Sequence, residues 1–195
     1  VVRFMDKLRF TGLHRDFIYH TVTCGTTTGQ AHYMMQKILK GKGLWLDAKY
    51  SVRMVDVWTP MFDLSNHEKC LRKTSVAEKH IDKVAEMVVS RKAGNYDRLS
   101  LAHWLAKWYY RTYENQRGTR HFHVMKDRCM GCGLCARQCP EHAIECRDGH
   151  PVWVKEKCTL CLKCLHHCPG FAIQYGRHTI NHGQFVYPAK PGSGK

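Results

Sequence analysis

The sequence has no long hydrophobic run and little negative charge. No apolar stretch among the 195 residues approaches the length of a membrane span, and no secretory leader is present. We therefore expect a soluble cytoplasmic protein with no membrane partner. Asp and Glu number 16 against 31 Lys and Arg, so the formal net charge is +15, which favours an acidic partner protein. The basic residues are dispersed and no recognisable nucleic-acid reading motif accompanies them, so we do not expect a nucleic-acid partner.

Cysteine, in contrast, is abundant. Eight of the eleven cysteines follow the pattern C-x2-C-x2-C-x3-C-P, which occurs twice, as Cys129, Cys132, Cys135 and Cys139 and again as Cys158, Cys161, Cys164 and Cys168. Disulfides are not expected, because the count is odd and the C-x2-C spacing is typical of metal ligands. Structural zinc is the alternative, since two four-cysteine sites would also use eight thiolates, but zinc sites usually combine two separated C-x2-C pairs. Triplets with a remote fourth cysteine and a following proline instead predict two 4Fe-4S clusters.

The cysteine motif is part of an internal duplication. A shift of 29 positions (158 minus 129) also places Ala143 on Ala172 and Ile144 on Ile173. We expect the two isoleucines to pack between the clusters, because a module of this size has little room for an ordinary core. Residues 121–178 resemble the bacterial-type two-cluster 4Fe-4S ferredoxins, which have a small α+β fold. In that arrangement the last cysteine of each run binds the other cluster. The resemblance therefore implies two ligand sets: Cys129, Cys132, Cys135 and Cys168 for cluster 1, and Cys158, Cys161, Cys164 and Cys139 for cluster 2.

The N-terminal half alternates between strand and helix patterns. A β-rich run at 17–23 leads through a small and polar segment into a helix that ends at Gly41 and Gly43. A second strand is expected at 50–57, followed by a helix with apolar residues at helical spacing over 76–88. This alternation predicts an α/β domain with an open parallel sheet, in which ligands bind beyond the carboxyl ends of the strands. The loop 58–62 is expected at one of those ends.

The order of these elements ahead of a two-cluster module resembles the later half of the flavodoxin domain in flavodoxin-ferredoxin fusion proteins, over residues 1–94. The resemblance implies a partial flavodoxin-like sheet in which Thr23, Cys24 and Gly25 border the ring of FMN. A flavodoxin-like domain opens with a strand and a hydroxyl-rich phosphate loop. Neither precedes Val1. The domain is therefore expected to be truncated at its N-terminus, and FMN to bind only when the missing part is present.

The remaining segments carry further expectations. Residues 95–120 are expected to form a helical linker whose aromatic stripe, which includes Trp104, packs either in its own core or between the two domains, with the first alternative favoured. Residues 179–195 are expected to be a tail. The histidine pair at 166–167, inside the second cysteine run, is expected to be exposed.

Together these patterns predict an intracellular electron-transfer protein from an anaerobic or low-oxygen setting, with two 4Fe-4S clusters and a redox partner protein. No catalytic residue is required, so the chain is expected to be a redox component more than a stand-alone enzyme. Two alternatives stay open. One is an FMN-dependent oxidoreductase that passes electrons from flavin to the clusters, and the other is a structural zinc or nucleic-acid-binding module.

Overall fold

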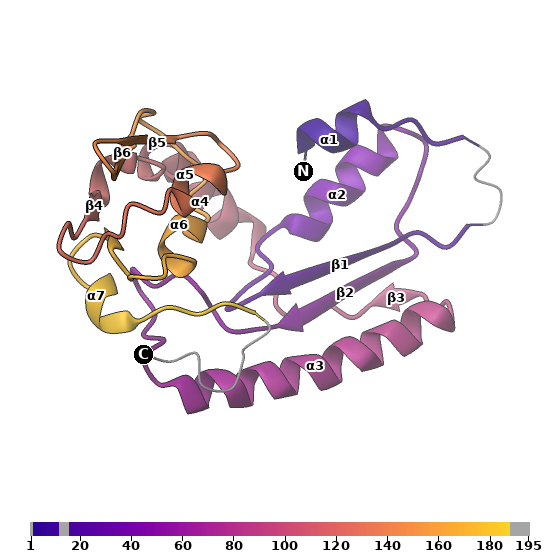
Figure 1. The fold of residues 1–195 in the computed structure, drawn as a ribbon. Coiled ribbons are helices and arrows are strands. Elements are labelled where there is room, and N and C mark those ends of the chain that lie inside the picture. Colours follow the sequence, from indigo (N-terminus) through magenta and orange to yellow (C-terminus); the bar gives the residue numbers. More distant parts are fainter. Residues whose placement is uncertain (1, 12–15, 188–195) are drawn as a thin grey trace. The chain divides into compact units, whose positions relative to one another are not determined.

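The computed structural model describes residues 2–11 and 16–187, which divide into two units (Figure 1). The first unit consists of Val1–Val55 and Ser75–Trp108, and the second of Asp56–Thr74 and Tyr109–Lys195. Residues 188–195 of the predicted tail lie outside the described residues. The domain boundaries predicted from the sequence remain predictions. No helix of the described residues is long and apolar enough to cross a bilayer.

The first unit is built on a three-stranded parallel sheet. Its strands are β1 (Tyr19–Cys24), β2 (Ala48–Arg53) and β3 (Gly94–Asn95), in the order β1-β2-β3. The helices α1 (Val2–Lys7) and α2 (Ala31–Lys40) accompany them, together with the part of α3 (His67–Val89) from Ser75 onward. The predicted mixture of helices with a parallel sheet is thus confirmed, whereas the closer likeness to flavodoxin stays a prediction.

The two faces of β2 explain how the sheet is covered. Tyr50 and Val52 project to one face, where they pack against Ala77 and Val84 of α3 in a buried apolar cluster. The opposite face of the sheet carries His20 of β1, whose ring meets a histidine of α2. Alternate strand residues therefore separate the layer under α3 from the layer under α2, as the period of two in a strand requires.

The second predicted strand is shorter than expected. It begins at Ala48 and ends at Arg53, so residues 54–57 lie outside the sheet. Beyond it the chain turns, and the Asp56 carboxylate accepts a hydrogen bond from the Trp58 backbone N–H at 3.1 Å. From Asp56 onward the chain belongs to the second unit. A β-rich pattern alone does not show where a strand loses its partner.

The second unit contains two antiparallel strand pairs and several short helices. Strand β4 (Phe122–Val124) pairs with β7 (Ile173–Tyr175), and β5 (Ile144–Arg147) pairs with β6 (His150–Trp153). The helices are the C-terminal part of α4 (His103–Gln116), the 3-10 turn η1 (Thr119–His121), α5 (Leu134–Arg137), α6 (Lys163–His166) and α7 (Thr179–His182).

The sequence duplication is present in this structure. The shift of 29 residues carries α5 onto α6 without a gap, β4 onto the last three residues of β6, and β5 onto β7. The hydrogen bonds are reciprocal as well. The N–H of Met125 donates to the carbonyl of Ala172 at 2.8 Å, and the N–H of Val154 donates to the carbonyl of Ala143 at 3.0 Å. Each half of the duplication is therefore fastened to the loop of the other half.

Three pairs of equivalent residues share the left-handed backbone conformation. They have φ of 65° and 49°, 68° and 54°, and 48° and 49°, for the pairs Gly131 and Leu160, Gly133 and Leu162, and His142 and Phe171. The first half places glycine at two of these positions, where a positive φ is least strained. The second half places leucine there, for which the left-handed conformation is unfavourable by about 1–2 kcal/mol per residue. The packing around the leucines must hold them in this conformation.

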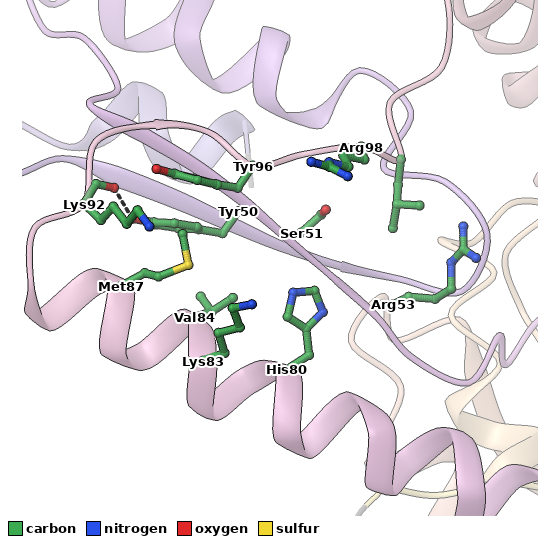
Figure 2. A pocket seen from close by; sticks show the side chains of 11 residues that line it. Tyr50, Ser51, Arg53, His80, Lys83, Val84, Met87, Lys92, Tyr96 and Arg98 are labelled. Atoms are coloured by element: carbon green, nitrogen blue, oxygen red, sulfur yellow. Dashed lines mark hydrogen bonds between the residues drawn. The ribbon is translucent and has the colours of Figure 1, made fainter.

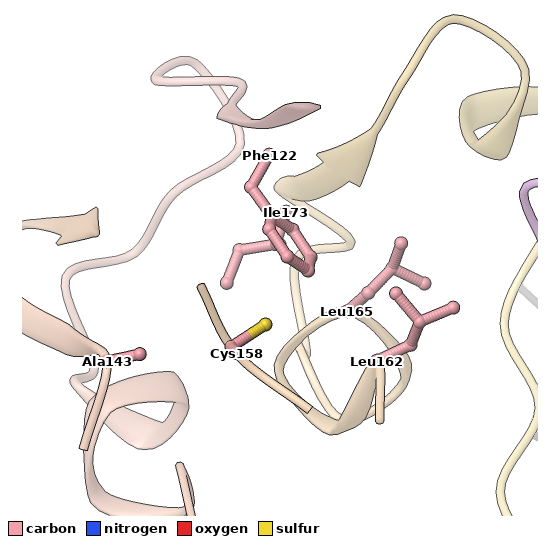
Figure 3. Packing of buried hydrophobic residues seen from close by; sticks show 6 residues of the cluster. All are labelled: Phe122, Ala143, Cys158, Leu162, Leu165 and Ile173. Atoms are coloured by element: carbon pink, nitrogen blue, oxygen red, sulfur yellow. The ribbon is translucent and has the colours of Figure 1, made fainter. Parts of the chain in front are cut away.

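A small apolar core supplies that packing (Figure 3). It joins six buried residues from both halves of the duplication: Phe122, Ala143, Cys158, Leu162, Leu165 and Ile173. Leu165 is fully buried, and Ile173 is 1% exposed. The second isoleucine, Ile144, is 6% exposed, so both isoleucines are buried, whereas their packing between the clusters stays a prediction. The Phe122 ring stacks on Trp153 with centroids 5.0 Å apart, which extends the core to β6.

His166 is buried, contrary to the expectation that it is exposed. Its Nδ1 accepts a hydrogen bond from the Phe185 N–H at 3.3 Å, so its Nε2–H donates to the Val57 carbonyl at 2.8 Å. Burial lowers the pKa of this imidazole, which agrees with a neutral ring. The histidine thus fastens two distant segments to α6. The nearby Gln184 side chain also donates to the Leu165 carbonyl at 2.6 Å, so residues 179–187 pack on the second unit.

The predicted linker contains the helix α4 and a segment bound to the second cysteine run. The N–H of Thr119 donates to the Glu156 carbonyl at 2.8 Å, and the N–H of Cys158 donates to the Arg117 carbonyl at 3.1 Å. In α4, Ala106 is buried, but Trp104 is 73% exposed. The favoured interpretation, that the aromatic stripe packs in its own core, is therefore wrong for Trp104. Helical spacing identifies a face but not whether anything covers it.

Candidate metal centre

The eight cysteines of the two runs surround two cavities in the second unit. The first cavity is lined by three cysteines of the first run together with the last cysteine of the second: Cys129, Cys132, Cys135 and Cys168. The second is lined by three cysteines of the second run together with the last cysteine of the first: Cys158, Cys161, Cys164 and Cys139. The structure therefore brings together the same two sets of four that the resemblance implied.

The same turn carries the fourth cysteine in each run. The N–H of Ala143 donates to Cys139 Sγ at 3.3 Å, and the N–H of Ala172 donates to Cys168 Sγ at 3.2 Å. The proline after each of these cysteines has no N–H to donate, which suits a turn. The reciprocal backbone hydrogen bonds described above then hold each alanine against the residue that follows a strand of the other half, Met125 after β4 and Val154 after β6. This pairing carries each fourth cysteine to the cavity of the opposite run.

Burial and mutual repulsion keep several of these thiols protonated when no metal compensates them. Burial, together with the neighbouring Cys161 and Cys158, raises the pKa of Cys164 to about 12. Burial likewise raises the pKa of Cys135 to about 11, and Cys168 contributes to the increase. The pKa of Cys158 is raised in the same way, with a contribution from Cys139. Each fourth cysteine is thus close enough to raise the pKa of a thiol in the run whose cavity it lines.

The donor set fits an iron-sulfur cluster. Thiolates are the ligands of 4Fe-4S clusters, and the iron charge stabilises the deprotonated form that burial disfavours. Across the described residues, no three His, Cys, Asp or Glu side chains converge closely enough to hold one metal ion. A cubane of four irons separates its ligands more widely than a single ion does, so four cysteines around one cavity are a suitable arrangement for it.

Arg117 is a neighbour of the second cavity that sequence analysis missed. Its Nε donates to the Cys158 carbonyl at 3.0 Å, next to the first cysteine of the second run. The sequence shows Arg117 only as one of many basic residues in a polar segment, and 41 positions separate it from Cys158. A long-range backbone pairing creates this contact, so no local pattern could have revealed it.

Cys146 is a fifth cysteine beside the first cavity. It lies in β5, is exposed, and lines the cavity with the four predicted ligands. Its charge also contributes to the raised pKa of Cys135. The sequence places it outside both cysteine runs. The duplication could not have indicated it, because the equivalent position in the second half is Tyr175.

The predicted flavin-bordering residues lie at the carboxyl end of β1. Thr23 and Cys24 are the last two residues of the strand, and Gly25 follows. Thr23 is exposed, whereas Cys24 and Gly25 are half-buried. Their predicted role is not tested by this arrangement. The second predicted loop, 58–62, belongs instead to the second unit, where the Trp58 ring lies 5.8 Å from that of Tyr175 between centroids.

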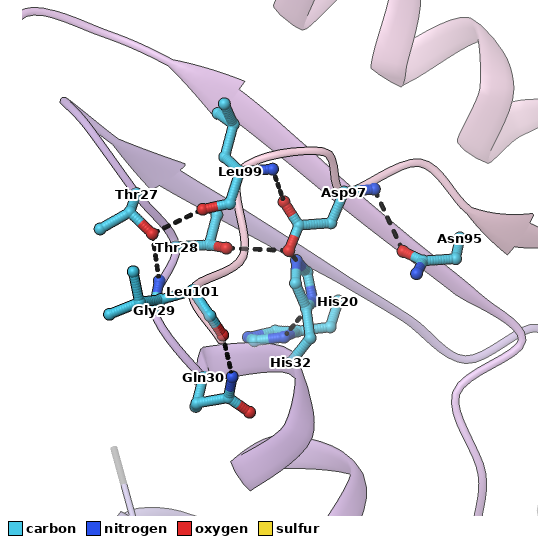
Figure 4. A network of polar contacts seen from close by, with 10 residues as sticks. All are labelled: His20, Thr27, Thr28, Gly29, Gln30, His32, Asn95, Asp97, Leu99 and Leu101. Carbon is cyan, nitrogen blue, oxygen red and sulfur yellow. Dashed lines mark hydrogen bonds and ion pairs between the residues drawn. The ribbon is translucent and has the colours of Figure 1, made fainter. Parts of the chain in front are cut away.

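The polar loop after Gly25 is bound within the first unit (Figure 4). The Thr27 hydroxyl donates to the Leu99 carbonyl at 2.5 Å, and the Thr28 hydroxyl donates to Asp97 Oδ2 at 2.8 Å. The backbone N–H of Leu99 also donates to the Asp97 carboxylate at 2.9 Å. These hydroxyls therefore join the loop before α2 to the segment after β3.

Two histidines complete this network. Nδ1 of His20 lies 3.0 Å from Nδ1 of His32, and Nε2 of His32 lies 3.7 Å from Asp97 Oδ2 (Figure 4). Burial lowers the pKa of both histidines, and the attraction of Asp97 opposes this effect at His32. The Asp97 pKa is lowered although burial alone would raise it, because hydrogen bonds from Leu99, Thr28 and Ser51 stabilise its charge. The network is a structural polar core.

Comparison with known proteins agrees with the chemistry of the cysteines. Residues 122–145 match the model of the Fer4 family, the 4Fe-4S binding domain. No curated protein and no solved structure matches the chain. The matched segment contains the whole first cysteine run, β4 and α5. The second unit therefore contains an iron-sulfur module of the ferredoxin kind, which supports a role in electron transfer.

Proposed function

We propose that this chain is an electron-transfer protein that carries two 4Fe-4S clusters with exchanged fourth ligands. One observation carries the proposal: each cavity is lined by three cysteines of one run and the last cysteine of the other. The matched family covers only the first run, and the 29-residue duplication extends the same chemistry to the second. Cluster 1 would then be held by Cys129, Cys132, Cys135 and Cys168, and cluster 2 by Cys158, Cys161, Cys164 and Cys139.

The protein's part in this function is to hold thiolates in a rigid and partly dry environment. A 4Fe-4S cluster, when bound, accepts and releases one electron at a time. Backbone N–H groups donate to the sulfurs of Cys139, Cys158 and Cys168 at 3.2–3.3 Å. Such hydrogen bonds stabilise added negative charge and so raise the reduction potential. The apolar core beside the second cavity, with Leu162 at 2% exposure, limits the access of water.

Metal and sulfide analysis of anaerobically purified protein tests the proposal. The expected result is about eight irons with matching sulfide per chain. About two zincs without sulfide would instead support the structural module. About four irons would show that only one cavity is used and would refute the two-cluster proposal.

Two ligand variants test the exchange of fourth cysteines. Cys139→Ala should remove the paramagnetic resonance signal of the cluster held by the second run. Cys132→Ala should remove the other signal, because Cys132 lines the first cavity. Cys24→Ala is the matched control, since Cys24 lies in β1 and outside both runs, and it should keep both signals. Loss of the same signal in the first two variants would contradict the exchange.

A second candidate function is that of an FMN-dependent oxidoreductase that passes electrons to the clusters. The observation in its favour is the parallel sheet, in which β1 ends at Thr23, Cys24 and Gly25, because parallel α/β sheets bind ligands at this end. Flavin absorbance that is retained through purification and weakened by Gly25→Ala would support it. For either function we propose a cytoplasmic location and an acidic redox partner protein, since the chain carries a formal charge of +15.

A further inference from the structure

The first unit contains a cavity of about 580 Å³ between β2 and α3 (Figure 2). This volume lies in the range of small-molecule binding sites. One side of the cavity is apolar and aromatic, with Tyr50, Val84, Met87 and Tyr96. The two tyrosine rings are parallel and stacked, at 5.5 Å between centroids with an interplanar angle of 10°, and Tyr50 is fully buried beneath Tyr96.

The other side of the cavity is cationic. The guanidinium groups of Arg53 and Arg98 lie on the side away from Met87, and the Lys83 side chain rises from α3 beside Val84 (Figure 2). Lys92 lies near the aromatic side, 5.7 Å from the centre of the Tyr96 ring. Among the described residues, no Asp or Glu lines this cavity. The cavity therefore separates an aromatic end from a positively charged end.

These cations have no internal counterion in the part of the chain that the structure describes. None of the four arginines and lysines at the cavity forms an ion pair there. Asp97, which precedes Arg98 in the sequence, is 3% exposed at its side chain and interacts with Thr28 and His32. Like charges around one cavity repel each other, and an anionic ligand removes that repulsion.

We propose that this cavity binds a phosphate monoester that carries a planar aromatic ring, the chemistry shared by nucleoside monophosphates and FMN. Guanidinium groups bind phosphate oxygens through paired hydrogen bonds, which Arg53 and Arg98 supply. The ring of the ligand lies toward Tyr96 and Met87 and away from water. The site goes beyond electron transfer and does not depend on the clusters, because all its residues belong to the first unit. It is also distinct from the loop at Gly25.

Calorimetric titration of the full chain with AMP and with FMN tests this proposal. At least one of the two esters is expected to bind saturably, and the one that binds identifies the source of the ring. Its unphosphorylated form, adenosine or riboflavin, is expected to bind at least tenfold more weakly, about 1.4 kcal/mol. Affinity should also fall as salt rises, because exposed charges are screened. The absence of saturable binding by both esters, or equal binding of the unphosphorylated form, overturns the proposal.

Two variants that each remove one positive charge locate the site. Arg98→Gln is expected to weaken binding at least tenfold. Lys79→Gln is the matched control, because Lys79 is exposed on α3 next to His80 but does not line the cavity, and it should bind like the unaltered chain. Equal binding by the two variants, or loss of binding only in Gly25→Ala, refutes the site. Iron content measured on the same samples shows separately whether the electron-transfer proposal holds.

Discussion

Gly170→Ala is the most direct test of how the two halves of the second unit are joined. A Cβ at Gly170 would lie 2.3 Å from the backbone oxygen of Arg128, whereas real Cβ atoms do not come closer than 3.0 Å. The obstacle is a backbone atom, so no side chain can rotate away. One of the two loops must move by about 0.7 Å, and such overpacking destabilises a protein by about 1–3 kcal/mol.

The consequence for the clusters follows from the position of this contact. Gly170 lies two residues after Cys168, and Arg128 precedes Cys129, so the displaced loops carry two ligands of the same proposed cluster. The equivalent of Gly170 in the other half is Glu141, which already has a side chain. The substitution should therefore damage cluster 1 and spare cluster 2. Iron per chain should fall from about eight toward about four, with loss of one paramagnetic resonance signal.

Gly118→Ala is the matched control in the same unit. Its Cβ would meet only a side-chain atom of Arg120 at 3.8 Å, and its φ of −64° suits any residue. This variant should retain about eight irons and the unfolding midpoint of the unaltered protein. The steric reasoning is refuted when Gly170→Ala matches Gly118→Ala in both measurements. The exchange of ligands is refuted when Gly170→Ala removes the signal assigned to the second run.

Three further predictions concern stability. Burial lowers the pKa of His20 and His32. The unfolded chain therefore binds protons below about pH 6.5 that the folded chain does not, so stability is full above that pH and falls as the pH falls below it. Hydrogen exchange at the amides of the first unit should show this loss, and His20→Asn should reduce it. Leu165→Ala should destabilise the second unit by about 2–5 kcal/mol in denaturant unfolding, because Leu165 is fully buried. Val89→Ala, at a residue 84% exposed, should change stability by less than about 0.5 kcal/mol. Removal of iron by a chelator should abolish hydrogen-exchange protection between β4 and β7, since the core there is small. Retained protection would show that the metal does not hold this unit together.

Local patterns predicted the regular elements of the first unit well. The strand at 17–23, the helix before Gly41 and the helix over 76–88 are all present, although α3 begins earlier, at His67. These segments have clear strand or helix periodicity because one face of each is covered. The end of β2 was predicted too late, because a strand ends where its neighbour ends, and that neighbour is distant in sequence.

Burial of individual polar and aromatic residues was harder to predict. His166 is buried because Val57 and Phe185 meet it, and 109 positions separate Val57 from His166. Trp104 is exposed although its helical stripe looks like a core face. Both outcomes depend on which surface the rest of the chain covers. That information is not contained in a window of neighbouring residues.

The sequence by itself determined the chemistry of this protein: eight thiols at metal-ligand spacing, in two runs of four that are 29 residues apart. Spacing along the chain is a local property, and it determines which three cysteines of a run can line the same cavity. Only the tertiary structure decided that each fourth cysteine lines the cavity of the other run, and that cations from β2, α3 and the segment after β3 line one pocket. Such groups meet only when distant segments pack, because long-range contacts and not neighbouring residues bring them together.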